Sequence, residues 1–278
     1  MSGLPNADQR AYWNGPVGER WVKFGDITDR SLADAADGAL RRAAARLGER
    51  VLDIGCGAGR TSLLLADAVG PHGLVTGVDI SAPLLGAARA RAGDARNVTF
   101  VEADAAAHAF APGYDLVFSR FGVMFFDDPI AAFSNIQTAL KSGGRLAFIC
   151  WRPAMENQWV ALPAAAAKDL LPAQPPPDPV APGPFAFADA KRVEAILAAA
   201  GFGGIEIAPF DGRMDLGRDA DQAAYQMANI GPLSRALAEV DEETSARVRQ
   251  AVKAALQKIA TPDGIRPAIA CWLVGARA

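Results

Sequence analysis

Cysteine, histidine and an excess charge of one sign are all scarce in this chain. Its 278 residues include 3 Cys and 2 His, and 28 Lys and Arg stand against 31 Asp and Glu. Cys56, Cys150 and Cys271 are scattered without paired spacing, which argues against a disulfide framework and against a zinc or other metal site. Because phosphate backbones are bound by basic faces, the balanced charge argues against a nucleic-acid partner. The expected partner is therefore a small molecule.

A leader segment and long hydrophobic runs are missing as well. The first residues, MSGLPNADQR, contain no basic region followed by an apolar run, so no signal peptide is expected. No apolar stretch reaches the roughly 20 residues that span a bilayer. We therefore expect a cytoplasmic protein without a membrane segment, and the sequence leaves open whether it forms a homo-oligomer.

The chain does contain an alternation of strand-like and helix-like runs that begins near residue 50. Apolar runs predict strands at residues 51–54, 74–78, 97–101, 114–118, 145–151, 204–208 and 269–276. Helices are predicted at residues 61–69, after Ser81, from Asp128 to Gly143 and Gly144, after Asp189, and over most of 219–260. This order predicts an α/β protein with a doubly wound, mostly parallel seven-stranded sheet.

The segments outside this alternation are expected to form a helical cap over the carboxyl ends of the strands, where such sheets bind ligands. The prolines between residues 172 and 184 are too dense for regular secondary structure locally. The predicted units are an N-terminal helical lid (1–45), a ligand-binding core (46–151), a Pro-rich cap insert (152–188), a core helix and strand (189–211), a helical cap (212–265) and a final core strand (266–278).

A glycine-rich string follows the first predicted strand. It runs from Asp53 to Gly59 in the order Asp-Ile-Gly-Cys-Gly-Ala-Gly. Glycine lacks a Cβ atom, so a turn built from glycines lets the backbone pass close beneath a ligand. Asp53, at the strand end, is placed to interact with a positively charged group, directly or through water.

This string resembles motif I, D-x-G-x-G-x-G, of the class I, Rossmann-like S-adenosylmethionine-dependent methyltransferases. Three further matches follow in the family's order, at residues 77–81, 102–105 and 114–121. The resemblance covers residues 50 to about 150 and implies a Rossmann-like fold with S-adenosyl-L-methionine as cofactor. The cofactor contacts that it implies are Trp21, Asp53, Gly55, Cys56, Gly57, Asp79, Ile80, Asp104, Ala105, Ser119, Arg120 and Phe121.

Two acids in these matches have specific roles in such enzymes. By the resemblance, Asp79 accepts hydrogen bonds from both ribose hydroxyls, as acids do at this position in dinucleotide-binding sheets. Asp104 accepts a hydrogen bond from the adenine amino group, and the backbone N–H of Ala105 meets a ring nitrogen of the adenine. A ring face of Phe121 near the sulfonium would attract it by a cation–π interaction. The alternatives are a helix-capping role for Asp79 and a turn role for Asp104. Asp115 is expected to serve the fold.

Residues 12–14, 119–129 and 151–153 resemble a subgroup of bacterial small-molecule methyltransferases related to the C-methyltransferases of quinone biosynthesis. The rival interpretation is an NAD-dependent oxidoreductase, whose site expects G-x-G-x-x-G. Here Gly59 comes one position early and the bulky Arg60 follows it, which favours the methyltransferase. A repurposed or non-catalytic cofactor-binding protein of this fold also stays open.

The resemblance implies in-line transfer of a methyl group from sulfur to a small, largely apolar acceptor. Because the sulfonium is already a strong electrophile, the protein mainly supplies alignment, desolvation and exclusion of water. No catalytic residue is assigned; His108 is a candidate general base, with packing as its alternative role. Tyr12, Trp151, Asn157 and Trp159 are the expected acceptor contacts. No motif identifies the acceptor or says whether oxygen, nitrogen, carbon or sulfur is methylated.

Overall fold

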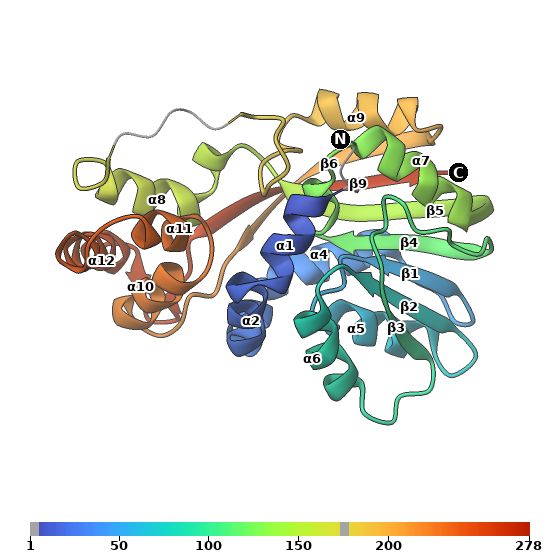
Figure 1. Ribbon diagram of the computed structural model, residues 1–278, viewed down its shortest axis with the longest axis horizontal. Coiled ribbons are helices and arrows are strands. Elements are labelled where there is room, and N and C mark those ends of the chain that lie inside the picture. Colours follow the sequence, from blue (N-terminus) through green and yellow to red (C-terminus); the bar gives the residue numbers. More distant parts are fainter. Residues whose placement is uncertain (1–5, 173–177) are drawn as a thin grey trace.

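A twisted seven-stranded sheet runs through the middle of the molecule (Figure 1). The computed structural model describes residues 6–172 and 178–278. The strands of this sheet are β1 (Arg50–Ile54), β2 (Leu74–Asp79), β3 (Val98–Glu102), β4 (Tyr114–Arg120), β5 (Leu140–Trp151), β6 (Gly203–Arg213) and β9 (Ala268–Arg277). Their order is β3-β2-β1-β4-β5-β9-β6, and β9 runs antiparallel to both of its neighbours while the other pairs are parallel. The predicted fold class is confirmed.

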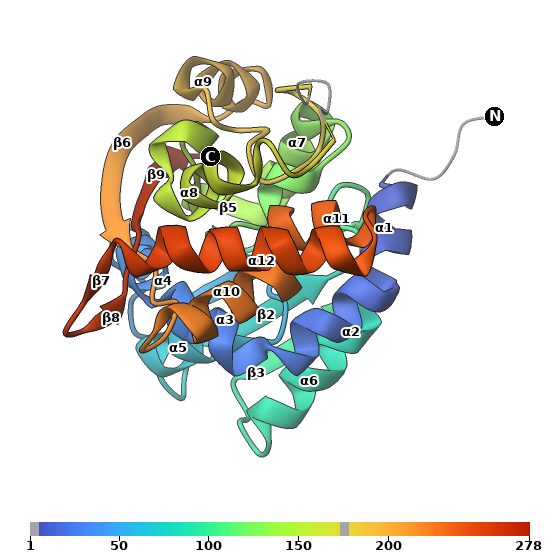
Figure 2. The ribbon, with the colours of Figure 1, turned by 90° about the vertical axis from the view of Figure 1, so that its left-hand side faces the viewer.

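Helices cover the sheet and continue beyond it. They are α1 (Ala7–Asn14), α2 (Pro16–Lys23), α3 (Gly25–Ser31), α4 (Ala33–Ala43), α5 (Arg60–Val69), α6 (Ala82–Ala92), α7 (Pro129–Ala139), α8 (Gln158–Ala167), α9 (Ala190–Ala199), α10 (Ala220–Asn229), α11 (Pro232–Ala238) and α12 (Glu242–Gln257), with short 3₁₀ turns at Val123–Phe125 and Ala154–Glu156. Helix α7 packs against β5 and α9, and α4 packs against β4, β5 and β9. Figure 2 shows α7 and α9 at the top and α4 and α5 lower down, so the sheet lies between helix layers.

The helix starts follow the capping residues of the sequence. Ser81, Asp128 and Asp189 each precede a helix, and each side chain accepts a hydrogen bond from a backbone N–H of the first turn. Such a bond satisfies one of the N–H groups that a helix start leaves without a partner inside the helix. The helices predicted after these three residues are therefore confirmed.

The chain reverses its direction of travel across the sheet at β1. From β1 it proceeds outward to β2 and β3, and it then crosses back to β4 on the other side of β1. In the register of the two inner strands, Asp53 of β1 lies beside Phe118 of β4. The carboxyl ends of neighbouring strands diverge at such a switch point and leave a crevice for ligands. The glycine string follows β1 at this place.

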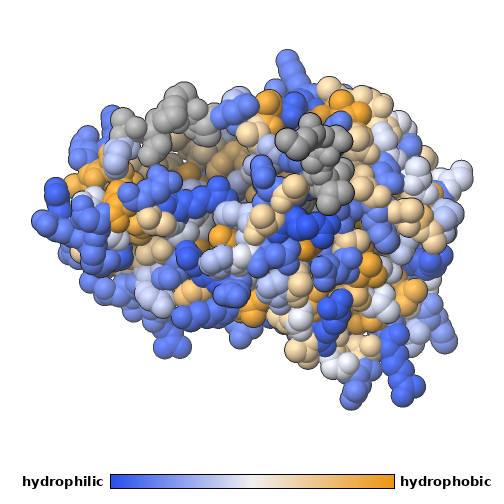
Figure 3. Space-filling view, in the orientation of Figure 1, coloured by the Kyte–Doolittle hydropathy of each residue, from blue (hydrophilic) through white to orange (hydrophobic). Residues whose placement is uncertain are grey.

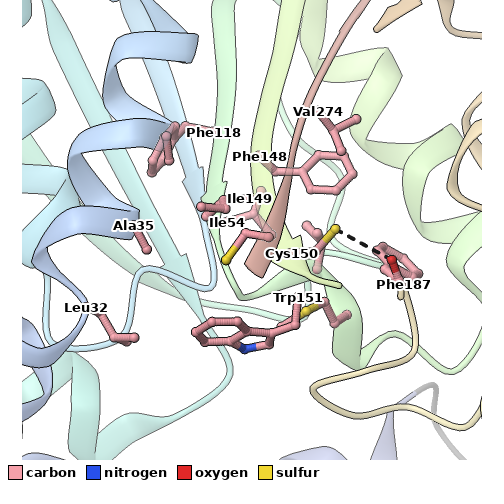
Figure 4. Packing of buried hydrophobic residues seen from close by; sticks show 14 of the residues in the cluster. Leu32, Ala35, Ile54, Phe118, Phe148, Ile149, Cys150, Trp151, Phe187 and Val274 are labelled. Carbon is pink, nitrogen blue, oxygen red and sulfur yellow. Dashed lines mark hydrogen bonds between the residues drawn. The ribbon is translucent and has the colours of Figure 1, made fainter. Parts of the chain in front are cut away.

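The core of the sheet reaches the same crevice. Phe118, Phe148 and Ile149 are fully buried on β4 and β5, as expected for strands covered on both faces. Figure 4 shows these side chains with Ile54 and Trp151, which lie at the ends of β1 and β5. The ends of the inner strands are therefore tightly packed where they border this crevice.

Two predicted boundaries are wrong. Helix α7 ends at Ala139, and the two glycines expected to end it lie inside β5, where residues 141–144 bulge between the pairs Tyr114–Leu140 and Leu116–Arg145. Strand β6 extends to Arg213 instead of residue 208, because β9 pairs with it along its whole length. The predicted Pro-rich insert contains the regular helix α8 before the proline stretch; residues 178–184 of that stretch form no helix or strand, and residues 173–177 lie outside the described residues.

A group of helices beyond the sheet forms the cap. Helices α8, α10, α11 and α12 pack against one another, and Val248, Val252 and Leu256 of α12 are fully buried among them. The long strands β6 and β9 reach toward this group, which lies at the left of Figure 1. A two-stranded hairpin, β7 (Ala260–Thr261) and β8 (Gly264–Ile265), leads back to β9. The visible face of the cap is mostly hydrophilic (Figure 3).

The N-terminal helices divide into two groups. Helix α4, which the sequence assigns to a lid, lies on the face of the sheet and buries Ala35, Ala39 and Ala43 there. Helices α1, α2 and α3 lie beside the strand ends, and α2 packs on α6. Among residues 6–172 and 178–278, no helix has the length and apolar character needed to cross a membrane.

Candidate functional site

A cavity of about 1290 Å³ lies at the carboxyl ends of the inner strands. Its walls come from the segments that follow β1, β2, β3, β4 and β5, from α2 and α3, and from the cap helices α8, α10 and α11. The sequence-predicted residues that line it are Trp21, Gly55, Cys56, Gly57, Asp79, Ile80, Asp104, Ala105, Arg120, Phe121, Trp151 and Trp159. Residues from five separate strand ends therefore meet in one space.

The other predicted contacts lie outside this lining. Ser119 is fully buried, and its hydroxyl donates to the Ile54 carbonyl (2.8 Å) and accepts from the Gly122 N–H (3.2 Å). The Asn157 side chain bonds the backbone of β9 through Ala270 N–H (2.9 Å), so it fixes the cap to the sheet. His108 is exposed, and its ring packs on Phe110 with centroids 4.8 Å apart. The structure does not bring His108 to the cavity, and the packing interpretation fits its position.

Two glycines of the string pack closely against other parts of the protein, and a third borders open space. Gly55 and Gly59 have positive φ angles, 66° and 78°, and a Cβ atom on either would come within 2.9 Å of Gly122 or of Ala88. Gly57 has φ 54°, and a Cβ atom there would meet nothing within 4 Å. Gly57 is therefore the place where the loop lets a ligand approach its backbone.

Asp79 is held by the backbone on both sides. Its Oδ2 accepts from the Gly57 N–H (2.8 Å) and its Oδ1 accepts from the Ser81 N–H (2.9 Å). Burial raises the pKa of Asp79, and the hydrogen bonds from Ser81 and Gly57 oppose that rise. Because each carboxylate oxygen has two lone pairs, each keeps one for a ligand hydroxyl.

Asp104 has a protein partner that no motif indicated. The Asn6 Nδ2 donates to both carboxylate oxygens of Asp104, at 2.8 and 2.9 Å, and Ala106 N–H donates to one of them. Asn6 in turn exchanges two hydrogen bonds with the backbone and side chain of Asp127. A ligand amino group at Asp104 therefore has to share the carboxylate with Asn6 or replace it.

Asp53 and Arg120 form a buried pair of opposite charges near the switch point. Asp53 is fully buried below the glycine string, where the hydroxyls of Ser62 (2.6 Å) and Thr61 (2.8 Å) donate to its Oδ2. Burial raises the pKa of Asp53 to about 6, although these hydroxyls and the Arg120 charge oppose the rise. Within the described residues, neither Asp53 Oδ1 nor Arg120 Nη1 has a hydrogen-bond partner.

A chain of charges links Arg120 to the lid. Its Nη2 lies 3.5 Å from Asp29 Oδ1 on α3, and the other oxygen of Asp29 lies 2.7 Å from Arg91 Nη1 on α6. Burial lowers the pKa of the Arg120 guanidinium, and the Asp29 charge counteracts this effect. Arg120 and Asp29 line the cavity, whereas Arg91 does not. One end of the cavity thus has a fixed, partly unsatisfied guanidinium.

Helix α1 lies against the β2–α6 turn through Asn14. The Asn14 Nδ2 donates to the Ile80 carbonyl (2.8 Å), and its Oδ1 accepts from the Ala82 N–H (2.9 Å). The neighbouring Trp13 carbonyl accepts from the Ser81 hydroxyl (2.8 Å). These bonds place α1 directly beside Asp79.

The two aromatic residues before Asn14 have different partners. The Trp13 ring makes edge contacts with Trp21 and Phe125, each with centroids 5.6 Å apart, and all three line the cavity. The Tyr12 hydroxyl accepts from Arg235 Nε (2.9 Å) and Nη2 (2.7 Å) on α11. Tyr12 itself is not in the lining; it joins the lid to the cap.

Aromatic rings from the ends of β4 and β5 and from the cap helix α8 meet in one part of the cavity wall. Phe121 stacks on Trp151 with centroids 4.1 Å apart and planes 8° apart, and Trp159 of α8 lies 5.0 Å from Trp151. The backbone of Phe121 has φ 61°, a left-handed conformation that non-glycine residues seldom adopt. Such backbone strain is typical of functional sites, where the surrounding packing holds it.

Residues 51–144 match the family model described as a methyltransferase domain. This segment is a methyltransferase domain. It is similar to the aklanonic acid methyltransferase DauC of Streptomyces sp. (strain C5), with 39% identity over 104 residues that cover 36% of this chain and 47% of that protein. The demethylmenaquinone methyltransferase of Staphylococcus aureus (strain JH9) is 35% identical over 100 residues, which cover 36% of this chain and 42% of that protein.

The similarity thus spans less than half the length of these curated relatives. Among solved structures, the phosphoethanolamine N-methyltransferase 2 of Haemonchus contortus aligns with 99% of this chain and 60% of its own, with TM-score 0.59 and 19% identity. At that identity the likeness shows the fold. The Rossmann-like methyltransferase domain inferred from the glycine string is confirmed over residues 51–144.

Several cavity residues outside the methyltransferase domain were not assigned individually as ligand contacts from the sequence, although Trp13 was expected in a lid helix and the helix at residues 219–235 in the cavity wall. They include Asn6, Trp13, Asp29, Gln226 and Arg235. Trp13 belongs to the recognised segment at residues 12–14, which was a usable signal. The others lie in helices and turns without a motif, and only the folded chain brings them to the strand ends.

Proposed function

We propose that this chain transfers a methyl group from S-adenosyl-L-methionine to a small, largely apolar acceptor. The observation on which this proposal depends is that strand-end groups of the methyltransferase domain line one cavity together with apolar cap residues. Pockets for small ligands commonly measure about 300–1,000 Å³, so a cavity of about 1290 Å³ has room for a cofactor and an acceptor side by side.

The residues at the strand ends fit this cofactor. Gly57 leaves open space for close approach, and Asp79 keeps lone pairs for two ribose hydroxyls. The amino-acid end of the cofactor has one positive and one negative group. Arg120 Nη1 offers a buried donor to its carboxylate, and the charge of Asp53 favours its ammonium group. The solved Haemonchus contortus enzyme is a complex with S-adenosyl-L-methionine, which supports the same choice.

The acceptor side is defined by aromatic rings. Phe121, Trp151 and Trp159 present ring surfaces to the cavity, and ring surfaces favour flat, apolar ligands. The relatives named for aklanonic acid and demethylmenaquinone support a small-molecule acceptor.

The contribution of the chain to the reaction follows from these positions. When bound, the cofactor supplies an electrophilic methyl group on a sulfonium. Asp79 and Arg120 hold the two ends of the cofactor, and Phe121 and Trp151 hold the acceptor flat against the strand ends. Helices α1 to α3 exclude water, which strengthens the electrostatic contacts inside the cavity. The rate enhancement then comes from holding the cofactor and the acceptor in line for the displacement.

The function is tested by titrating the chain with S-adenosylhomocysteine in a calorimeter and by following transfer of labelled methyl from S-adenosyl-L-methionine to a panel of flat aromatic acceptors. We expect saturable binding and labelled product from at least one acceptor. A chain that binds neither form of the cofactor contradicts the proposal. Binding without transfer to any acceptor indicates a repurposed cofactor-binding protein.

Substitution of Asp79 tests the ribose contact. We expect Asp79→Ala to weaken binding of S-adenosylhomocysteine by about 1–3 kcal/mol, because two hydroxyls lose their shared acceptor. Asp79→Asn keeps one acceptor oxygen and should lose less. Calorimetry measures both; equal affinity of the Ala variant and the wild type removes Asp79 from the site.

Substitution of Arg120 tests the amino-acid end. Arg120→Met should weaken binding of S-adenosylhomocysteine by about 1.5 kcal/mol, or tenfold, because the carboxylate of the ligand loses a charged hydrogen-bond donor. Adenosine, which lacks that carboxylate, should bind the variant and the wild type equally. Arg91→Met is the matched control, because Arg91 also pairs with Asp29 but does not line the cavity. A loss common to both ligands, or to both variants, contradicts the assignment.

A further inference from the structure

One buried polar side chain in the cavity wall has an unused acceptor. In the described part of the chain, the buried polar residues that line the cavity are Asn6, Thr28, Ser31, Asp104 and Gln226. Asn6 and Asp104 bond each other, and Thr28 donates to the Phe24 carbonyl (3.0 Å). Gln226, which is 7% exposed, donates through Nε2 to the Ser31 hydroxyl (2.6 Å). Among residues 6–172 and 178–278, no group donates to its Oε1.

The contacts of Ser31 determine which way the Gln226 amide points. The Ser31 Oγ lies 2.8 Å from the Ile27 carbonyl and 2.8 Å from the Asp215 carbonyl. A hydroxyl has one hydrogen, and these two carbonyl oxygens already compete for it. A third acceptor at 2.6 Å would have no hydrogen to share, so the Gln226 atom facing Ser31 is the nitrogen. The oxygen therefore occupies the other position of the amide.

Apolar residues accompany Gln226 in the cavity lining. It lies on α10 next to Met227, and its partner Ser31 bonds the carbonyl of Asp215, whose chain neighbours Met214 and Leu216 line the same cavity. Gln226 Oε1 is not among the fully buried atoms of the described residues that lack a partner, so it is open to the cavity. A ligand that displaces water from this oxygen has to supply a hydrogen bond in its place, because the desolvation of the oxygen is otherwise uncompensated. Pockets for small molecules use such isolated polar groups in apolar walls to orient their ligands.

We infer that Gln226 Oε1 accepts a hydrogen bond from a hydroxyl group of the acceptor, and that Ser31 positions the amide for this contact. The acceptor is then a flat, apolar molecule that has a hydroxyl group, and not a pure hydrocarbon. This inference rests on the proposed function only in calling the ligand an acceptor; the contact itself concerns the cap side of the cavity.

The test compares two probes of equal shape, 2-naphthol and 2-methylnaphthalene, by calorimetry in the presence of saturating S-adenosylhomocysteine. We expect the wild-type chain to prefer 2-naphthol. Gln226→Met should reduce the affinity for 2-naphthol three- to tenfold, which is the value of one neutral hydrogen bond, and leave 2-methylnaphthalene unchanged. Met227→Leu, on the neighbouring position of α10, is the control and should affect both probes equally.

Ser31→Ala provides a second variant in case Gln226→Met fails to fold, which thermal unfolding reveals. It frees the amide to turn and should reduce the preference for 2-naphthol while Gln226 is retained. Equal affinity for the two probes in the wild type, no measurable binding of 2-naphthol, or parallel losses of both probes in Gln226→Met would overturn the inference. If the chain prefers 2-naphthol but does not bind S-adenosylhomocysteine, the contact stands and the proposed function fails.

Discussion

A Gly57→Val chain is expected to fold and to show no measurable binding of S-adenosylhomocysteine. A Cβ atom at this position meets no protein atom within 4 Å, so the valine side chain extends into the space that we assign to the cofactor. The two methyl groups of the valine occupy the space of the ligand. The backbone N–H of residue 57 also donates to Asp79, so a shift of the loop would disturb that carboxylate as well. We expect the affinity to fall by more than about 100-fold, or about 2.7 kcal/mol.

The valine also places a β-branched residue at φ 54°, which costs about 1–2 kcal/mol of stability by itself. Gly93→Val is the matched control, because Gly93 has φ 52°, has no atom within 4 Å of its Cβ position and lies at the exposed end of α6. Both variants should show a similar drop in melting temperature, and only Gly57→Val should lose binding. Full binding by Gly57→Val would show that no ligand approaches the loop.

Asp53 is expected to make stability fall as the pH rises from about 4 to about 6. Burial raises its pKa from 3.8 to about 6, whereas in the unfolded chain the ordinary value returns. Between these values the folded state holds a proton that the unfolded state has released, so each step upward in pH favours unfolding. The accumulated effect is about 3 kcal/mol at neutral pH.

Asp53→Asn removes this titration. Relative to wild type, the variant should gain about 3 kcal/mol between pH 4 and pH 7, measured by urea unfolding at several pH values. Asp115→Asn is a control of opposite sign: hydrogen bonds from Arg50 and Lys141 hold the pKa of Asp115 below its ordinary value despite partial burial. Its stabilising effect is present above that value and is lost on acidification. A flat difference between wild type and Asp53→Asn would mean that Asp53 does not titrate in this range.

The alternation of apolar runs was enough to predict the sheet and the helices beside it, because strands buried on both faces have continuous apolar sequences. The cap was less predictable. Helix α8 contains Pro163, a residue that usually interrupts a helix, and this obscures the start that Asn157 at its N-cap would otherwise indicate. The full length of β6 depends on pairing with β9, which lies more than fifty residues further along the chain.

The site was predictable where one short segment supplies several contacts. Gly57 comes shortly after β1 and Asp79 ends β2. Because parallel strands end at the same edge of a sheet, their positions in the strand–helix–strand order predict that they lie close together. Asp53 and Ser119 were expected as contacts because they belong to the same motifs, yet their side chains turn into the protein and bond Ser62 and the Ile54 carbonyl. Gln226 belongs to no motif, and its hydrogen bond to Ser31 exists only because α3 and α10 meet in the folded chain.

The two ends of the insertion between β6 and β9 lie together. Arg213 pairs with Ala268, and the next residue, Met214, donates its N–H to the Pro267 carbonyl (3.0 Å). Residues 214–267 therefore leave and rejoin the sheet at a single point, and exchange of this module leaves the strand order and the glycine string untouched. Under the proposed function, the part of the cap formed by this module is therefore separate along the chain from the strand ends that would hold the cofactor. Relatives that share residues 51–144 are free to differ in the rest.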